Sequence, residues 1–251
     1  MVYVTGDCHA DYRRFGSKTF RDAKTMSRND TMIILGDFGL WHDTPEERYW
    51  LDWLNDRPFT TVWVDGNHEN YDRLDSDEFQ ICDFHGGKAH KIRDNIYHLM
   101  RGHIFEFDGK TFWAFGGAQS HDISDGILDR DNYKDDESFK RAVARFRMRN
   151  KMFRINHRSW WEQELPSEEE MAFGIKTLAE HGNKVDYIIS HCCPQEIATF
   201  MGFRTPDKET MYFNEIAHSV QFDDWWFGHY HQDSEIFGKF HCRYWKIERI
   251  M

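Results

Sequence analysis

Five short apolar runs in this chain have the composition of buried β-strands, and each leads directly into a polar residue. The runs are Val-Tyr-Val-Thr before Gly6-Asp7, Met-Ile-Ile-Leu before Gly36-Asp37, Val-Trp-Val before Asp65-Gly66-Asn67, Tyr-Ile-Ile-Ser before His191 and Trp-Trp-Phe before Gly228-His229. Strands that end in glycine and a polar side chain are how an α/β fold presents chemical groups at the carboxyl ends of its strands. The pattern therefore predicts an α/β protein whose functional groups meet at strand ends.

Helices and hairpins are predicted between these runs. Thr44 followed by Pro45 is typical of a helix cap and a first helical residue, and Trp50, Trp53 and Leu54 then share one face. Ser167 and Glu170 form a capping box that begins a second helix, which is expected to end near Gly182. Alternating apolar residues predict two hairpins, at residues 103–116 and at residues 235–249.

The middle segment, residues 119–166, interrupts this alternation of strands and helices. It contains a basic, helix-like stretch (residues 140–151) and, further along, Ser159-Trp160-Trp161. One interpretation is a cap over the functional site that supplies Arg154, His157 or Arg158 to bind substrate. The other is an ordinary helix pair whose charged face meets solvent. Trp160 and Trp161 fit a packed core better than a base-stacking platform.

The polar residues at the strand ends have the spacing and chemistry of metal ligands. The pairs Asp7-x-His9 and His229-x-His231 place two side chains on one side of an extended segment, within reach of one ion. Carboxylate and imidazole without thiolate suit manganese, iron, zinc, cobalt or nickel. Seven ligands are too many for one four-coordinate zinc but fit two divalent ions, with manganese favoured.

These motifs resemble those of the calcineurin-like metallophosphoesterases, in the phosphodiesterase and nuclease branch. The family pattern is Asp-x-His, Gly-Asp, Gly-Asn-His-(Asp/Glu), a lone His and Gly-His-x-His, and this chain has all five motifs in that order. The resemblance implies that the first metal is held by Asp7, His9 and His231 and the second by Asn67, His191 and His229. It implies that Asp37 bridges the two metals.

The resemblance also implies a mechanism. A hydroxide between the two metals would attack the phosphorus of a phosphoester in line, and the metals would neutralise the charge that develops on the phosphoryl oxygens. His68 would bind no metal and would protonate the leaving group. The implied fold is a four-layer α/β/β/α sandwich, two mixed sheets flanked by helices, in one domain over residues 1–251.

Two family features are missing from the chain. The family often has Gly-Asp-x-x-Asp, whose second Asp orients the catalytic histidine, but here Gly36-Asp37 is followed by Phe38-Gly39-Leu40. His42 or Asp43 are the candidates to replace it. The Asp-Arg-Gly sequence of protein Ser/Thr phosphatases is absent as well, and this counts against a protein phosphatase.

Composition and charge limit the possible substrates and the expected location of the protein. The chain has 251 residues and a formal net charge of −11, which argues against a broad surface for extended nucleic acid. Small phosphoesters, nucleotides and short oligonucleotides are the expected substrates. No apolar stretch reaches the roughly 20 residues of a membrane span, so no membrane association is expected. The five scattered cysteines and the absence of a signal peptide predict reduced thiols and a cytoplasmic location.

Three functions remain open on the sequence. The first is a two-metal phosphoesterase, with a phosphodiester or nucleotide favoured over a monoester. The second is a protein phosphatase, and the third is a catalytically silent scaffold of the same fold. The sequence does not name the oligomeric state.

Overall fold

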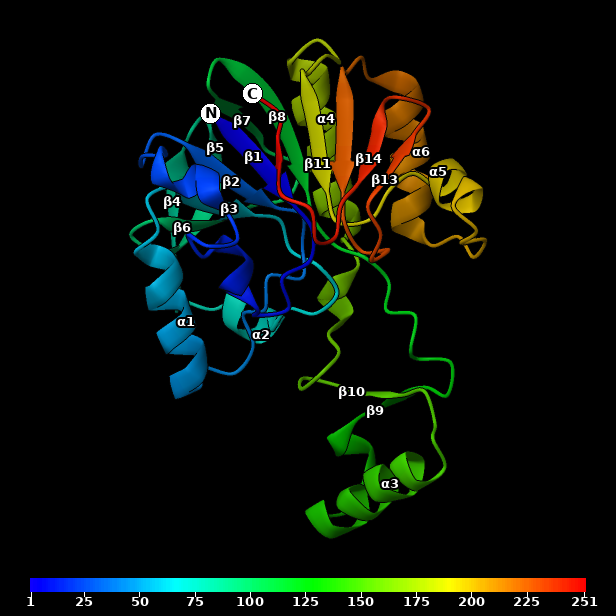
Figure 1. Ribbon diagram of the computed structural model, residues 1–251. Helices are drawn as coiled ribbons and strands as arrows, with labels where there is room; N and C mark the ends of the chain where they lie inside the picture. Colours follow the sequence, from blue (N-terminus) through cyan, green and yellow to red (C-terminus); the bar gives the residue numbers. More distant parts are fainter.

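Two β-sheets packed face to face form the centre of the computed structural model, which describes residues 1–251 (Figure 1). The larger sheet has seven strands in the order β15-β1-β2-β3-β6-β5-β4, namely β1 (Val2–Thr5), β2 (Thr31–Ile34), β3 (Thr60–Trp63), β4 (Gln80–Phe84), β5 (Gly87–Arg93), β6 (Ile96–Leu99) and β15 (Glu248–Arg249). The smaller sheet has six strands in the order β13-β14-β12-β11-β8-β7, namely β7 (Ile104–Phe107), β8 (Lys110–Phe115), β11 (Tyr187–Ser190), β12 (Asp224–Phe227), β13 (Ser234–Ile236) and β14 (Phe240–Cys242).

Helices cover the outer face of each sheet (Figure 1). The larger sheet is covered by α1 (Pro45–Asn55) and α2 (Tyr71–Leu74), and the smaller one by α4 (Glu168–Glu180), α5 (Gln195–Phe200) and α6 (Lys208–Ser219). The four-layer α/β/β/α sandwich expected from the sequence is therefore confirmed. None of these helices combines the length and apolar character that crossing a bilayer requires.

The alternation of side chains along each strand produces three separate apolar layers. In β1, Val2 and Val4 face the smaller sheet, whereas Tyr3 packs beneath the helices on the outer side. In β11, Ile189 points to the same central layer and Ile188 points outward to α4 and α6. Successive residues of a strand point to opposite faces, so strands buried on both faces read as continuous apolar runs.

Parallel pairing explains why the polar strand ends meet. Strands β1, β2 and β3 are parallel neighbours in one sheet, and β8, β11 and β12 are parallel neighbours in the other. The carboxyl ends of parallel strands lie at the same edge of their sheet, where ligands bind in open α/β folds. The loops that follow five of these strands carry all the polar motifs of the sequence.

The local predictions between the strands are confirmed, with one correction. Thr44 caps α1, Ser167 forms its capping box with Glu170 at α4, and β7 and β8 make the expected hairpin. The second hairpin covers only β13 and β14, because β15 leaves the smaller sheet and pairs antiparallel with β1. The alternating sequence of residues 235–249 does not indicate that its last strand joins the other sheet.

The middle segment forms a small layer of its own, which projects from the sandwich in Figure 1. It contains β9 (Ile127–Leu128), α3 (Asp136–Met148) and β10 (Arg154–Ile155), and β9 pairs with β10. Its core is a cluster of Leu128, Phe139, Val143 and Ile155. Trp161 packs instead in the core beneath α1, as expected for a core tryptophan.

A buried ion pair joins β3 to the end of the middle segment. Asp65, which is 1% exposed, accepts a hydrogen bond from Arg101 Nε at 2.9 Å and lies 3.0 Å from His98 Nε2. Arg101 also donates to the carbonyl of Gln163 at 2.8 Å. Asp65 directly precedes Gly66-Asn67-His68, so this pair fixes the backbone from which the site residues project.

We expect Arg101→Met to lower the free energy of unfolding by about 3–5 kcal/mol, because it leaves the Asp65 carboxylate buried without its cation. Lys110→Met is the matched control, since Lys110 pairs with Asp186 at 2.6 Å with side chains 43% and 27% exposed. An exposed pair contributes about 0–1 kcal/mol. Equal losses for the two variants in urea unfolding would contradict the structural role of the Asp65 pair.

Candidate metal centre

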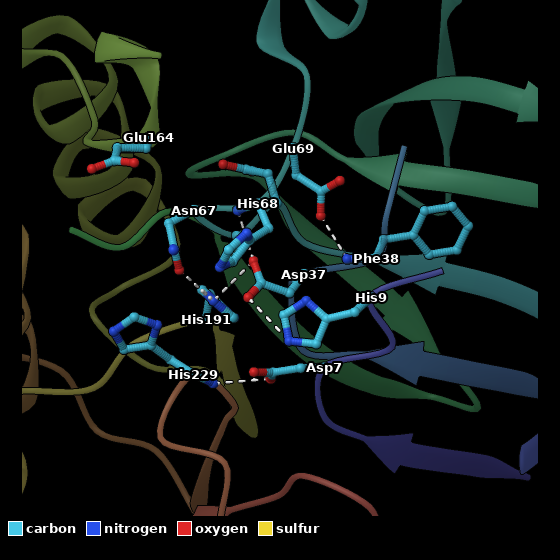
Figure 2. Close-up of polar contacts among 12 residues, drawn as sticks. Asp7, His9, Asp37, Phe38, Asn67, His68, Glu69, Glu164, His191 and His229 are labelled. Carbon is cyan, nitrogen blue, oxygen red and sulfur yellow. Dashed lines mark hydrogen bonds and ion pairs between the residues drawn. The ribbon is translucent and has the colours of Figure 1, made fainter. Parts of the chain in front are cut away.

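The polar loops converge at the carboxyl ends of β1, β2, β3, β11 and β12, between the two sheets. Figure 2 shows Asp37 at the centre of this group, with His9 and His191 on opposite sides of it. The larger sheet contributes Asp7, His9, Asp37 and Asn67, and the smaller sheet contributes His191, His229 and His231. The site is therefore built by both sheets and belongs to neither alone.

Four of the predicted ligands form one compact cluster. The ligand atoms of Asp7, His9, Asp37 and His231 all lie within 4.8 Å of one another. His231 Nε2 is 3.1 Å from Asp7 Oδ2, and His9 Nε2 is 3.2 Å from His231 Nε2. This is the set expected around the first metal, together with the proposed bridging carboxylate.

The remaining three predicted ligands lie on the other side of Asp37. His191 Nε2 lies 3.4 Å from Asp37 Oδ1 and 3.3 Å from Asn67 Oδ1. The ring of His229 is centred 5.0 Å from that of His191, and its backbone N–H donates to Asp7 Oδ1 at 3.0 Å. Asp37 thus contacts both groups, as a bridging carboxylate would.

The donor set fits divalent metal ions. Asp7 Oδ2 is buried without a hydrogen-bond donor, because the nearby His231 Nε2 is not aligned to donate to it. Buried carboxylate oxygens without partners are costly, and a bound cation would satisfy this one. Oxygen and imidazole donors without thiolate are those that manganese, iron or zinc accept.

Two glycines allow these ligands to approach each other. A Cβ added to Gly66 would lie 2.2 Å from Asp37 Oδ1, and one added to Gly228 would lie 2.3 Å from Asp7 Oδ1. Real side chains never show such contacts, so any larger residue would displace a carboxylate. The glycine before each polar residue is therefore required by close packing at the site.

The backbone at the ligands is left-handed rather than extended. His9, Asp37, His229 and His231 have φ values of 45°, 45°, 66° and 49°. The extended geometry expected for the two paired motifs is therefore wrong, because the chain turns sharply as it leaves each strand. Non-glycine residues with left-handed φ values are strained, and such residues are concentrated at functional sites.

Charge interactions at Asp37 shift the pKa values of its neighbours. Burial alone would raise the pKa of Asp37, but His191 outweighs it and holds that pKa well below its usual range. Burial also opposes the charged form of His191, yet Asp37 raises the pKa of His191 to about 10. The Leu35 carbonyl lies 2.7 Å from His191 Nδ1 and accepts a hydrogen bond from it, which leaves Nε2 facing Asp37 and Asn67.

His68 lies over the site and contacts the middle segment. Its backbone N–H donates to Asp37 Oδ1 at 2.9 Å, and Arg154 Nη2 donates to its Nε2 at 3.0 Å. A guanidinium can only donate, so His68 Nε2 is unprotonated in this arrangement. Burial lowers the pKa of His68 to about 4, with Asp37 opposing and Arg154 adding to the effect.

Neither candidate for the missing aspartate contacts His68. Asp43 pairs with Arg48 at 2.8 Å on the surface, and His42 only lines the same cavity as His68. Arg154 is the side chain that holds the imidazole. Sequence reasoning assigned no role to Glu69, whose buried carboxylate accepts backbone N–H bonds from Phe38, Gly39 and Leu40 at 2.6–3.2 Å and thereby fixes the loop after Asp37.

The three basic residues expected to bind substrate are separated by the fold. Arg154 and Arg158 line a cavity of about 300 Å³ together with His68. Arg154 is oriented by Asp122, which accepts from its Nε at 2.6 Å. His157 instead lies on the outer side, where its Nδ1 is 2.8 Å from Asp72 Oδ1. The structure therefore brings two of the three to the site.

Ser120 orients the amide of Asn67. Asn67 Nδ2 donates to Ser120 Oγ at 3.4 Å, and Ser120 Oγ donates to Glu164 Oε2 at 2.6 Å. Burial raises the pKa of Glu164 to about 7, although Ser120 opposes this shift. With its nitrogen held by Ser120, the amide of Asn67 presents Oδ1 to His191, which is the orientation that a metal ligand needs.

His121 also lies at the site, although no sequence motif points to it. Its Nε2 lies 2.7 Å from His229 Nε2, and the two rings are centred 4.7 Å apart. No other polar side chain contacts its imidazole nitrogens. Its irregular surroundings in the sequence form no ligand motif, and its position becomes evident only from the contact with His229.

Comparisons with known proteins agree with this geometry at the level of family. The sequence model described as calcineurin-like phosphoesterase matches residues 1–233. A comparison with curated proteins finds no match. The crystal structure of Phosphopantetheinyl Hydrolase (PptH) from Mycobacterium tuberculosis is similar at 16% identity, covering 97% of this chain and 89% of that chain with a TM-score of 0.38. That structural likeness is too low to carry any argument about activity.

We expect Ser120→Ala to weaken binding of the second equivalent of Mn²⁺ by about tenfold, because the Asn67 amide loses the partner that orients it. Isothermal titration of metal-stripped protein measures this directly. Ser219→Ala is the control, since Ser219 bonds only within the end of α6. Unchanged affinity at both sites would show that Asn67 needs no such support.

We expect His121→Ala to lower the affinity for the second metal and to leave the first unchanged, because His121 faces His229 and not the cluster around Asp7. Substitution with Co²⁺ provides the readout, since its visible absorption reports the number of ligands. His218→Ala is the matched control, as His218 pairs with Glu196 at 3.3 Å on the surface. Identical spectra for His121→Ala and the parent protein would exclude a contact with the ion.

Proposed function

The chain belongs to the calcineurin-like phosphoesterase family, and from this premise we propose that it is a two-metal phosphodiesterase. The observation that carries the proposal is the double cluster around Asp37, with four ligand atoms within 4.8 Å of one another and three further donors beyond it. Asp7, His9 and His231 would hold one ion, Asn67, His191 and His229 the other, and Asp37 would bridge them. Manganese is the metal that we favour.

The bound ions would supply a nucleophile derived from water at neutral pH and would neutralise charge on the phosphoryl oxygens. The residues of the chain supply the remaining parts of the reaction. Asp37 Oδ1 accepts a hydrogen bond from the backbone N–H of His68, which fixes the backbone from which the imidazole extends over the site. From there it can reach the oxygen of a leaving group.

Arg154 and His68 exchange partners during the reaction that we propose. A substrate phosphate competes with His68 Nε2 for the guanidinium, because charge-assisted hydrogen bonds to phosphate are stronger than those to a neutral ring. The released Nε2 then takes up, through solvent, the proton that the attacking water gives up, and donates it to the departing alkoxide. Arg154 remains on the phosphate as its cationic clamp, which replaces the arginine found in the missing Asp-Arg-Gly sequence.

A diester fits the surroundings better than a monoester. Two cavities lie next to the metal centre, one of about 390 Å³ beside His9 and one of about 300 Å³ beside His68. Both are lined by Trp41 and His42, so they are neighbours that meet at these two side chains. A phosphodiester has a group on each side of phosphorus to fill both cavities, and a monoester has only one.

We expect metal-stripped protein to recover hydrolysis of bis-p-nitrophenyl phosphate when Mn²⁺ is added, with slower turnover of p-nitrophenyl phosphate. His68→Ala should lower kcat about 10²–10⁴-fold on the dinucleotide thymidylyl-thymidine, whose alkoxide needs a proton. The same variant should lose far less on bis-p-nitrophenyl phosphate, because its phenolate leaves without one. Asp37→Asn should lose both activities together with bound metal.

The outcomes separate the alternatives. Turnover of the monoester alone would favour a phosphatase. Absence of turnover on all three substrates, with two metals bound, would contradict the proposed activity. An equal loss on both diesters in His68→Ala would assign His68 to positioning rather than proton donation.

A further inference from the structure

Helix α3 and the strand that follows it carry a basic run without acidic residues. Between Ser138 and Arg158 the chain has eight lysines and arginines and no aspartate or glutamate, although the whole protein has a net charge of −11. The helix macrodipole accounts for arginines in the last turn of α3. It does not account for Lys140 in the first half of the helix or for Arg158 beyond it, so the run has another cause.

Part of this run lines a groove on the middle segment. A cavity of about 510 Å³ has Phe139, Val143 and Ile155 at its floor and Lys140, Arg147 and Arg158 at its rim. These three cations form no ion pair, whereas Arg130 on the same rim is neutralised by Asp136. Unpaired cations around an apolar floor suit a ligand that is anionic and carries flat apolar groups.

The groove adjoins the cavity beside His68. Arg158 lines both this groove and the cavity that contains His68 and Arg154. The cavity beside His9 is lined by Asp11, Glu46 and Glu47, of which Asp11 pairs with Arg13 and Glu47 with Arg73, and it offers no unpaired lysine or arginine. An anionic extension of a substrate would therefore be attracted to the unpaired cations beyond His68 and not to the cavity beside His9.

We propose that this groove binds the leaving-group arm of a short single-stranded oligonucleotide, with its next phosphates on Lys140, Arg147 and Arg158. The inference rests on the proposed phosphodiesterase function and names its substrate class. His68 protonates the leaving group, so the arm that enters its cavity and continues to the groove is the arm that departs. An acidic peptide would satisfy the same cations, but only a phosphodiester chain also places a scissile phosphate at the metals.

The test compares one large and one small substrate. The double variant Lys140→Glu with Arg147→Glu should raise KM for a thymidine hexanucleotide at least about tenfold and should leave turnover of bis-p-nitrophenyl phosphate unchanged. The slope of log(kcat/KM) against log[salt] should become shallower by about 1.4, the value for two phosphate contacts to a single strand. Arg145→Glu is the matched control, since Arg145 lies on the opposite face of α3 and does not line the groove.

Binding without cleavage provides a second readout. The His68→Ala protein with Mn²⁺ should bind the fluorescently labelled hexanucleotide, as measured by anisotropy. Adding Lys140→Glu and Arg147→Glu to this protein should weaken the binding by a factor similar to the increase in KM. Poly-glutamate at the same charge concentration should compete poorly. Equal competition by poly-glutamate would assign the groove to an acidic protein and overturn the nucleic-acid occupant.

The two proposals fail in different ways. Turnover of the small diester together with equal hexanucleotide binding by the parent and the double variant would overturn the groove and leave the phosphodiesterase intact. Absence of diester turnover would contradict the phosphodiesterase, and the anisotropy measurement would still decide whether the groove binds an oligonucleotide.

Discussion

The close approach of two sheet edges is the constraint on which the site depends. Asp37 ends a strand of one sheet and His191 ends a strand of the other, yet Asp37 Oδ1 and His191 Nε2 are 3.4 Å apart. No side chain fits between the loops at this distance, and Gly66 would contact Asp37 Oδ1 at 2.2 Å if it carried a Cβ. Left-handed backbone at four of the seven proposed ligands follows from the same crowding, because each chain must turn at once on leaving its strand.

Buried polar contacts transmit this geometry to the middle segment. Arg101 joins Asp65 to Gln163, and Ser120 joins Asn67 to Glu164, so both ends of residues 119–166 are attached to the loop that follows β3. Leaving a buried polar group of such a network unpaired costs free energy, so the network favours one position of the middle segment over others. The position of Arg154 over His68 is a consequence of these contacts.

The sequence predicted those parts of the site that local rules determine. Strand, glycine and polar residue follow one another in the chain, so the seven proposed ligands and the sandwich could be inferred before any coordinates. The contact of Arg154 with His68 and that of His121 with His229 could not, because they join an irregular segment to residues 86 and 108 positions away in the chain. The pairing of β15 with the larger sheet could not be predicted for the same reason. Alternation of apolar and polar residues shows that a strand exists, but it does not show which strand is its partner.

Net charge was a poor guide to the distribution of charge around the site. A value of −11 argued against polyanionic ligands, but it averages acidic surfaces elsewhere with a basic run in which no acid occurs for twenty residues. Screening limits electrostatic attraction to about 8–10 Å at physiological salt, so a ligand responds to the cations near it and not to the total. Unpaired cations lie beyond His68, whereas the cavity beside His9 has no unpaired lysine or arginine, so a charged substrate would bind in one orientation.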